Sequence, residues 1–239
     1  TALDQKIYDW QLWHRYEELP KYQTQLNQLK EDIASQKLTL ARLEYHHQQM
    51  LEHWQRLKQK AVPDLVAMAS LLSEQQINQL FTELDKRNTE KRDELLDEQT
   101  DLSQQKQDRL AERNKKLKRW LGSLSSEQTQ LVSSAYDEYY DNRMLWLEYR
   151  ANYQTALKAL LLEIAQQPDK QQQLQRRLTQ DLLAPERYRS EELVTRNQHN
   201  VTVFREFLLA MDNRLSKQQR QHLLGELDEY QQEIASLLR

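Results

Sequence analysis

The residues that break helices and form tight turns are almost missing from this chain, which has two glycines and four prolines among 239 residues. Strands need such residues at their turns and edges, so a chain this poor in both has little room for a sheet. Apolar residues instead recur at helical spacing. One such stripe, which we expect Pro63 to end, consists of Leu40, Leu43, His47, Met50, Trp54 and Leu57. The sequence therefore predicts an all-α fold.

The helical spacing continues along nearly the whole chain and predicts about eight or nine helices, some of them long. A heptad repeat does not persist, which favours a bent bundle over one coiled coil. The apolar fraction of 38% is low for a compact globule, yet five Trp, eleven Tyr and three Phe argue against disorder. We expect an elongated, bent helical bundle that forms a single domain of residues 1–239. No apolar run approaches the ~20 residues that span a bilayer.

Composition also narrows the classes of function. The absence of cysteine excludes disulfides, thiolate catalysis and thiolate metal sites. A net charge of −3 disfavours a nucleic-acid partner. Gly122 and Gly225 are isolated and cannot build a phosphate-binding loop, and no H-E-x-x-H motif occurs. We predict a non-enzymatic protein with no catalytic residues, no cofactor and no metal site.

Four histidines are candidates for a functional role. His46, His47 and His53 lie with Met50 on one expected helix, and imidazole with thioether is a ligand set for copper. No acidic or cysteine ligand completes the set, so packed or hydrogen-bonded histidines are the favoured interpretation. His14 also falls on an apolar stripe, where a structural role is favoured over a functional one.

A short motif, L-S-x-x-Q, recurs at Leu72–Gln76, Leu124–Gln128 and Leu215–Gln219, with a looser copy at Leu102–Lys106. Serine at a helix N-cap accepts a hydrogen bond from the amide three residues on, and glutamine at that position reaches back to the cap amide. The motif therefore predicts helix starts. Its capping residues are Ser73, Gln76, Ser125, Gln128, Ser216 and Gln219.

An aromatic run follows the second motif. The segment from about Ser126 to Gln167 lacks Gly and Pro and, as one helix, would measure about 60 Å. On one face of that helix aromatic rings would alternate with arginines. Two interpretations of this face remain open: a surface that binds loosely structured peptide, or a seam between helices. The candidate protein-binding residues on that face are Tyr139, Arg143, Trp146, Arg150 and Tyr153.

A basic run lies just before this segment. Between Arg109 and Arg119 six cations and one acid give a local net charge of +5. Such a patch is compatible with phosphates, anionic lipid heads or an acidic client, although a solvated helix face is the commoner explanation.

Three longer segments stand out in their order along the chain: Trp13–Tyr22, which fits the pattern W-H-R-x-E-E-L-P-x-Y, then Leu182–Ser190 and Leu208–Gln219. Together they resemble an uncharacterised family of proteobacterial envelope lipoproteins. The motif residues are Trp13, His14, Arg15, Glu17 and Pro20. The L-S-x-x-Q motifs separately resemble the L-T-x-x-Q motifs of the Spy and CpxP type of periplasmic chaperones.

These resemblances imply a periplasmic protein, anchored to the outer membrane as a lipoprotein in its full-length form. We expect it to bind protein clients in a chaperone-like or stress-related role. The alternative is a structural or adaptor scaffold that recognises one specific envelope partner. Membrane contact is expected only through a lipid anchor, nucleic-acid binding is not expected, and a homodimer remains open.

Overall fold

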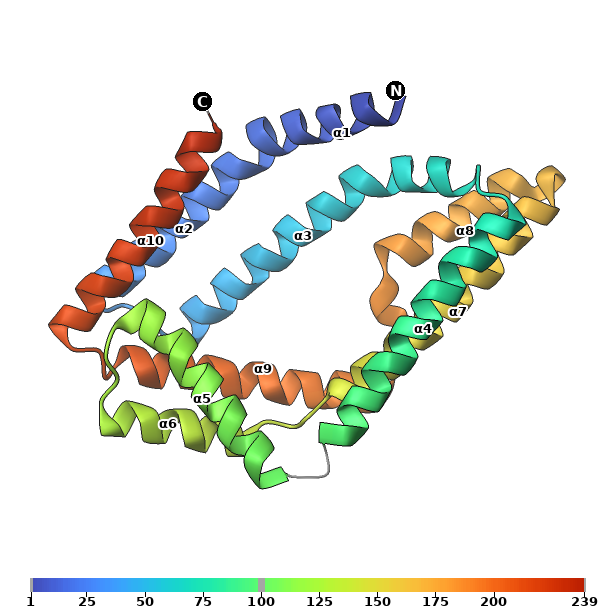
Figure 1. The fold of residues 1–239 in the computed structure, drawn as a ribbon. Helices are drawn as coiled ribbons and strands as arrows, with labels where there is room; N and C mark the ends of the chain where they lie inside the picture. The colour runs from blue at the N-terminus through green and yellow to red at the C-terminus, as the bar shows by residue number, and fades with distance from the viewer. Residues whose placement is uncertain (1, 99–101, 239) are drawn as a thin grey trace. The chain divides into compact units, whose positions relative to one another are not determined.

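The computed structural model describes residues 2–98 and 102–238, and these residues form helices and turns without a strand. The prediction of an all-α fold is confirmed (Figure 1). Because α1, the π-helical turn η1 and α2 follow one another without interruption, the described residues contain nine separate α-helical segments, within the predicted eight or nine. These elements are α1 (Ala2–Trp13), η1 (His14–Glu18), α2 (Leu19–Ala34), α3 (Leu40–Ala69), α4 (Glu74–Glu98), α5 (Leu102–Leu121), α6 (Ser126–Glu138), α7 (Arg143–Gln166), α8 (Gln171–Leu183), α9 (Glu191–Asp212) and α10 (Lys217–Leu237), with 3-10 turns η2 (Pro168–Lys170) and η3 (Pro185–Tyr188).

The chain divides into two compact units. Unit 1 consists of Thr1–Trp54, Ser103–Tyr139 and His199–Arg239, and unit 2 of Gln55–Leu102 and Tyr140–Gln198. Two of the boundaries fall inside the helices α3 and α9, which have no break there. The single domain of residues 1–239 therefore stays a prediction, since compact units that share helices need not fold separately.

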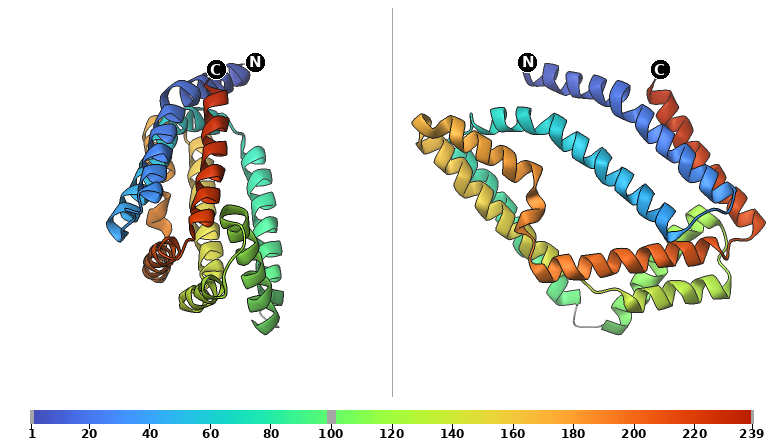
Figure 2. Two further views of the ribbon diagram at one scale, coloured as in Figure 1. Left: turned by 90° about the vertical axis from the view of Figure 1, so that its left-hand side faces the viewer. Right: turned by 180° about the vertical axis from the view of Figure 1, so that it is seen from behind.

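Unit 1 places α10 alongside α2, as both views in Figure 2 show. Its core contains Leu121, Val132 and Met211, which pack with Leu117 and Phe207 among others. Helix α5 ends beside this core at Gly122, whose φ of +76° is a left-handed conformation that most other residues adopt only with strain.

Unit 2 is built on the pair α4 and α7, with α8 packed on α7 (Figures 1 and 2). Its core is larger than that of unit 1 and includes Ile77, Phe81, Leu160 and Leu178, all at most 4% exposed. The apolar stripe of α4 thus packs against α7 and α8.

Pro63 contradicts the expectation that it ends a helix. Helix α3 continues through Pro63 to Ala69, so the predicted end there is wrong. Pro63 is exposed, and a proline inside a helix removes one hydrogen bond without necessarily stopping the chain. Pro20 lies in the first turn of α2, directly after the π-helical turn.

None of the helices in the described part of the chain combines the length and the apolar character needed to cross a bilayer.

Candidate functional site

The predicted face from Tyr139 to Tyr153 is interrupted. Helix α6 ends at Glu138 and α7 begins at Arg143, so the expectation of one continuous helix from Ser126 to Gln167 is wrong. Tyr139 has extended backbone angles (φ −75°, ψ 134°) and belongs to unit 1, whereas the other four candidates belong to unit 2. The five residues therefore do not lie on one helix face.

Arg143 is engaged locally. Its Nε donates to Oδ1 of Asp141 at 2.9 Å, and its Nη2 donates to Oδ2 at 2.7 Å. This two-point ion pair holds the guanidinium against the turn that precedes α7. Arg143 consequently packs against the start of α7 and is not among the residues that line the groove between α4 and α7.

The remaining three candidates, Trp146, Arg150 and Tyr153, line this groove between α4 and α7 together with Tyr149, which we did not predict. Trp146, Tyr149, Arg150 and Tyr153 of α7 face apolar residues of α4 across a volume of about 530 Å³. The α4 side consists of Leu80, Phe81 and Leu84, and Leu80 is 46% exposed. Among the described residues that line this groove, Arg150 carries the sole charged side chain. We call it the α4–α7 groove.

One wall of the α4–α7 groove is fixed by ring contacts. The guanidinium of Arg189 lies 5.0 Å from the ring centre of Trp146, and Tyr153 packs at 5.3 Å from Tyr188. Burial raises the pKa of Tyr153 to about 12, so this phenol stays neutral at physiological pH. Tyr153 thus packs against a neighbouring ring and also lines the groove, so both interpretations of the face stay open.

Buried Asp181 anchors the same wall from α8. Its Oδ2 accepts a hydrogen bond of 3.0 Å from the hydroxyl of Tyr188, and Arg187 forms an ion pair with it. The backbone carbonyl of Asp181 accepts a further bond of 3.3 Å from the hydroxyl of Tyr153. Sequence reasoning missed this carboxylate, whose position between Leu178 and Leu182 on α8 was the available signal.

The W-H-R-x-E-E-L-P motif forms the π-helical turn and the start of α2. Trp13, His14 and Arg15 are partly buried, whereas Glu17 and Pro20 are exposed. Of the two glutamates of the motif, the buried one is Glu18, whose side chain has no exposed surface. Glu18 continues the stripe of Trp10 and His14 at a spacing of four, which was the signal that the sequence offered.

Glu18 connects α2 with α3. Nζ of Lys21 donates to its Oε1 at 2.8 Å, and Nδ1 of His53 lies 3.4 Å from its Oε2. Nε2 of His53 faces Oε1 of Gln25 at 2.6 Å, and the ring of Tyr22 packs edge-on against the same imidazole. These contacts surround a charge that would otherwise be costly to bury.

The histidines on α3 make hydrogen bonds, as the favoured interpretation predicted. His46 lies 2.9 Å from Oδ2 of Asp32, and Nδ1 of His47 accepts from Arg205 at 3.1 Å. Within the described residues no group of three or more His, Cys, Asp or Glu is arranged to hold a metal ion.

The three L-S-x-x-Q motifs are N-caps, which confirms their predicted structural role. Gln76, Gln128 and Gln219 each donate a backbone amide to the serine of their motif and accept its amide with their side-chain oxygen. The looser copy departs from this pattern, because Ser103 lies inside α5 as the structure describes it.

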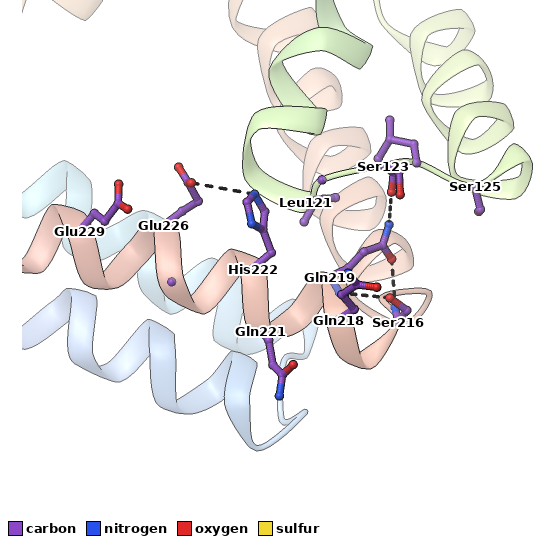
Figure 3. Close-up of a pocket in the computed structure, with 13 residues that line it drawn as sticks. Leu121, Ser123, Ser125, Ser216, Gln218, Gln219, Gln221, His222, Glu226 and Glu229 are labelled. Atoms are coloured by element: carbon purple, nitrogen blue, oxygen red, sulfur yellow. Dashed lines mark hydrogen bonds and ion pairs between the residues drawn. The ribbon is translucent and has the colours of Figure 1, made fainter.

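The second and third motifs also meet each other. The side-chain amides of Gln128 and Gln219 bond reciprocally at 3.0 and 2.8 Å. Nε2 of Gln128 also donates to the carbonyl of Arg214, and Nε2 of Gln219 donates to that of Ser123, as Figure 3 shows for the second bond. We call this arrangement the glutamine clasp, and it joins the starts of α6 and α10.

A polar pocket lies beside the glutamine clasp (Figure 3). Ser216, Gln219 and His222 of the α10 region border it, and Nε2 of His222 donates to the carbonyl of Arg119 at 2.9 Å. The polar side chains there form hydrogen bonds with nearby backbone, so we interpret this pocket as part of the structural contact between the helices.

Comparison with known proteins assigns the chain to a family. Residues 1–194 match a family of unknown function, DUF6279, and the chain belongs to that family. No curated protein and no solved structure matches the chain.

Proposed function

We propose that this protein binds other proteins without catalysing a reaction, and that the α4–α7 groove holds apolar segments of unfolding clients. The observation that carries the proposal is the groove itself, where aromatic and aliphatic side chains from both helices face a volume of about 530 Å³. Arg150 at its edge adds a planar cation that can stack on rings or pair with acids.

The groove suits clients that are held without being ordered. Its lining is almost wholly apolar, and apolar contact is not directional, so one groove accepts many sequences. The fixed rings of Trp146 and Tyr149 lose little conformational entropy when a client binds.

The cellular setting is proposed on the resemblance of the Trp13–Tyr22 motif to envelope lipoproteins. We propose that the protein acts in the periplasm as the soluble part of a lipoprotein, with a chaperone-like role. Lipid anchoring is tested by labelling the full gene product with a radioactive fatty acid in bacteria, and absence of label would remove that part of the proposal.

Suppression of insulin aggregation tests client binding. Dithiothreitol triggers this aggregation and leaves the present chain unaltered, because it has no cysteine. We expect near-stoichiometric protein to suppress light scattering, and Leu80→Glu to abolish suppression because it places a charge in the groove.

Leu96→Glu is the matched control. Leu96 lies on the same helix with 49% exposure, against 46% for Leu80, and is not among the residues lining the groove. Equal loss in both variants, or no suppression of insulin and two unrelated clients by the native protein, would remove the chaperone proposal. A single partner captured without any suppression would instead support the adaptor alternative.

A further inference from the structure

A second pocket lies in unit 1, where α5, α6 and α9 converge. Its apolar surface comes from Leu117, Val132, Ala135, Phe204 and Phe207, and its volume is about 240 Å³. Pockets for drug-sized ligands usually measure about 300–1,000 Å³, so this one fits a single short chain or ring. Phe204 is 50% exposed, which leaves the apolar surface open to solvent.

Arg113 gives this pocket a fixed positive charge. Its guanidinium lies 4.9 Å from the ring centre of Tyr139 and 5.2 Å from that of Tyr136. Two aromatic faces hold the planar group in place, which reduces the entropy lost when it binds an anion. Within the part of the chain that the structure describes, no carboxylate pairs with Arg113.

Two nearby cations are already paired. Lys116, which also lines the pocket, forms an ion pair of 2.7 Å with Glu112, and Lys106 forms one of 2.5 Å with Asp137. The pocket therefore presents one uncompensated cation beside an apolar surface. That charge pattern suits a ligand with one negative charge better than an acidic segment that carries several.

We propose that this pocket binds a medium-chain aliphatic carboxylate. The chain would pack against Leu117, Phe204 and Phe207, and the carboxylate would accept two parallel hydrogen bonds from the guanidinium of Arg113. The planar fork of arginine matches the two oxygens of a carboxylate, and the small volume limits the length of the chain.

Calorimetric titration with octanoate, 1-octanol and acetate tests the site. We expect octanoate to bind at least about tenfold more tightly than octanol, since hydrogen bonds to a charged group contribute more than neutral ones. Acetate should show no measurable binding because it lacks the chain. Equal affinity for octanoate and octanol, or no binding of octanoate, would overturn the proposal.

Variants on exposed positions separate the two halves of the site. Arg113→Gln should reduce octanoate affinity to that of octanol, whereas Lys118→Gln, an exposed cation on the same helix outside the pocket, should leave it unchanged. Phe204→Gln should weaken both ligands. Circular dichroism of each variant checks that the helices are intact.

Two further results bear on what occupies the pocket. Leu80→Glu should leave octanoate binding unaltered, because Leu80 belongs to unit 2, so this proposal and that for the α4–α7 groove fail separately. The second result concerns an acidic peptide that contains one phenylalanine. If this peptide binds in an Arg113-dependent manner and octanoate does not bind, the pocket serves a protein partner and the proposed carboxylate ligand is wrong.

Discussion

The side chains of Gln128 and Gln219 each accept and donate hydrogen bonds, whereas an ionised glutamate in the same place could only accept. The side-chain oxygen caps the residue's own helix, and the side-chain nitrogen donates both to the other glutamine and to the carbonyl before the other motif. Every donor and acceptor of the two amides is thereby used. Glutamate would keep the capping bond but lose both donated bonds.

Replacing Gln128 by glutamate therefore separates the contribution of the glutamine clasp to stability from that of the helix cap. Gln128→Glu should destabilise the fold by about 3 kcal/mol, because Gln128 is 1% exposed and its neighbours would lose donors beside a buried charge. Gln76→Glu should change stability by less than about 0.5 kcal/mol, since Gln76 is exposed and its bonds stay within its own motif. Urea unfolding of both variants measures the difference, and similar losses would show that the donated bonds of the clasp add no stability.

Asp32 contributes to the stability of unit 1 in a way that depends on pH. Burial by itself would raise the pKa of Asp32, but the hydrogen bonds from His46 and Arg42 outweigh it and lower this pKa below 3.8. A lowered folded-state pKa means that the carboxylate stabilises the protein above about pH 3.8, and that this stabilisation is lost as the pH falls through the folded-state value.

Asp32→Asn tests that contribution. We expect the variant to be less stable than the native protein by about 1–2 kcal/mol at pH 7, with the difference shrinking below pH 3.8 as native Asp32 takes up its proton. Urea midpoints at several pH values measure it, with exposed Asp93→Asn as the control. A difference that stays constant down to pH 2 would contradict the assignment.

Among the elements, the π-helical turn η1 has an identifiable cause. A proline ring in an α-helix collides with the carbonyl four residues earlier, which for Pro20 belongs to Tyr16 inside η1. A π-turn widens the backbone at that place and lets α1 pass into α2 without a break. The buried Glu18 is the last residue of this turn, and its carboxylate contacts His53 on α3.

Helix α10 is held at its start by one arginine. Arg220 donates to the carbonyl of Ile33 at 2.7 Å and to Oδ1 of Asp212 at 2.6 Å, joining α10 to the ends of α2 and α9. Both partners of this ion pair are largely buried. The contact therefore fixes the position of α10 beside α2.

Arg220→Ala should release α10. Leaving the Asp212 carboxylate buried and unpaired costs about 3–5 kcal/mol, so amide exchange in residues 217–237 should accelerate more than in α4 or α7. Arg214→Ala is the control, because the Arg214 side chain is exposed and donates to the nearby carbonyl of Ala210, while the backbone carbonyl that Gln128 bonds is kept in alanine. Hydrogen exchange read by mass spectrometry makes the comparison, and uniform acceleration in all helices would argue against a local role.

For the whole molecule, the open question is cooperativity between the two units. Helices α3 and α9 each contribute to both units without a break, so loss of structure in one unit would interrupt helices of the other. This continuity is why we retain the prediction of a single domain.

Phe81→Ala tests the single domain. Phe81 is 4% exposed in the core of unit 2, and its truncation should cost about 3–5 kcal/mol. If the protein is one domain, the slowest-exchanging amides of unit 1 should lose protection by the same free energy as those of unit 2. Unchanged protection in unit 1 would instead establish two separately folding units.

The fold class and three helix starts could be read from the sequence because they depend on local contacts. Scarcity of Gly and Pro, apolar spacing and the capping box act within a few residues of each other. The end of α6 could not be read in this way, since no Gly or Pro marks Tyr139–Asn142. Tyr139 is instead extended where its ring meets Arg113 of α5.

The candidate site was predicted only in part for the same reason. The aromatic stripe Trp146, Tyr149 and Tyr153 is a property of α7, whereas the groove exists because α4, more than 50 residues earlier, packs beside it. Local hydrogen bonds and spacing thus determined the helices of this protein. Contacts between residues distant in the chain decided which polar groups are buried, which glutamines form the clasp and where the apolar pockets open, because burial depends on what packs against each helix.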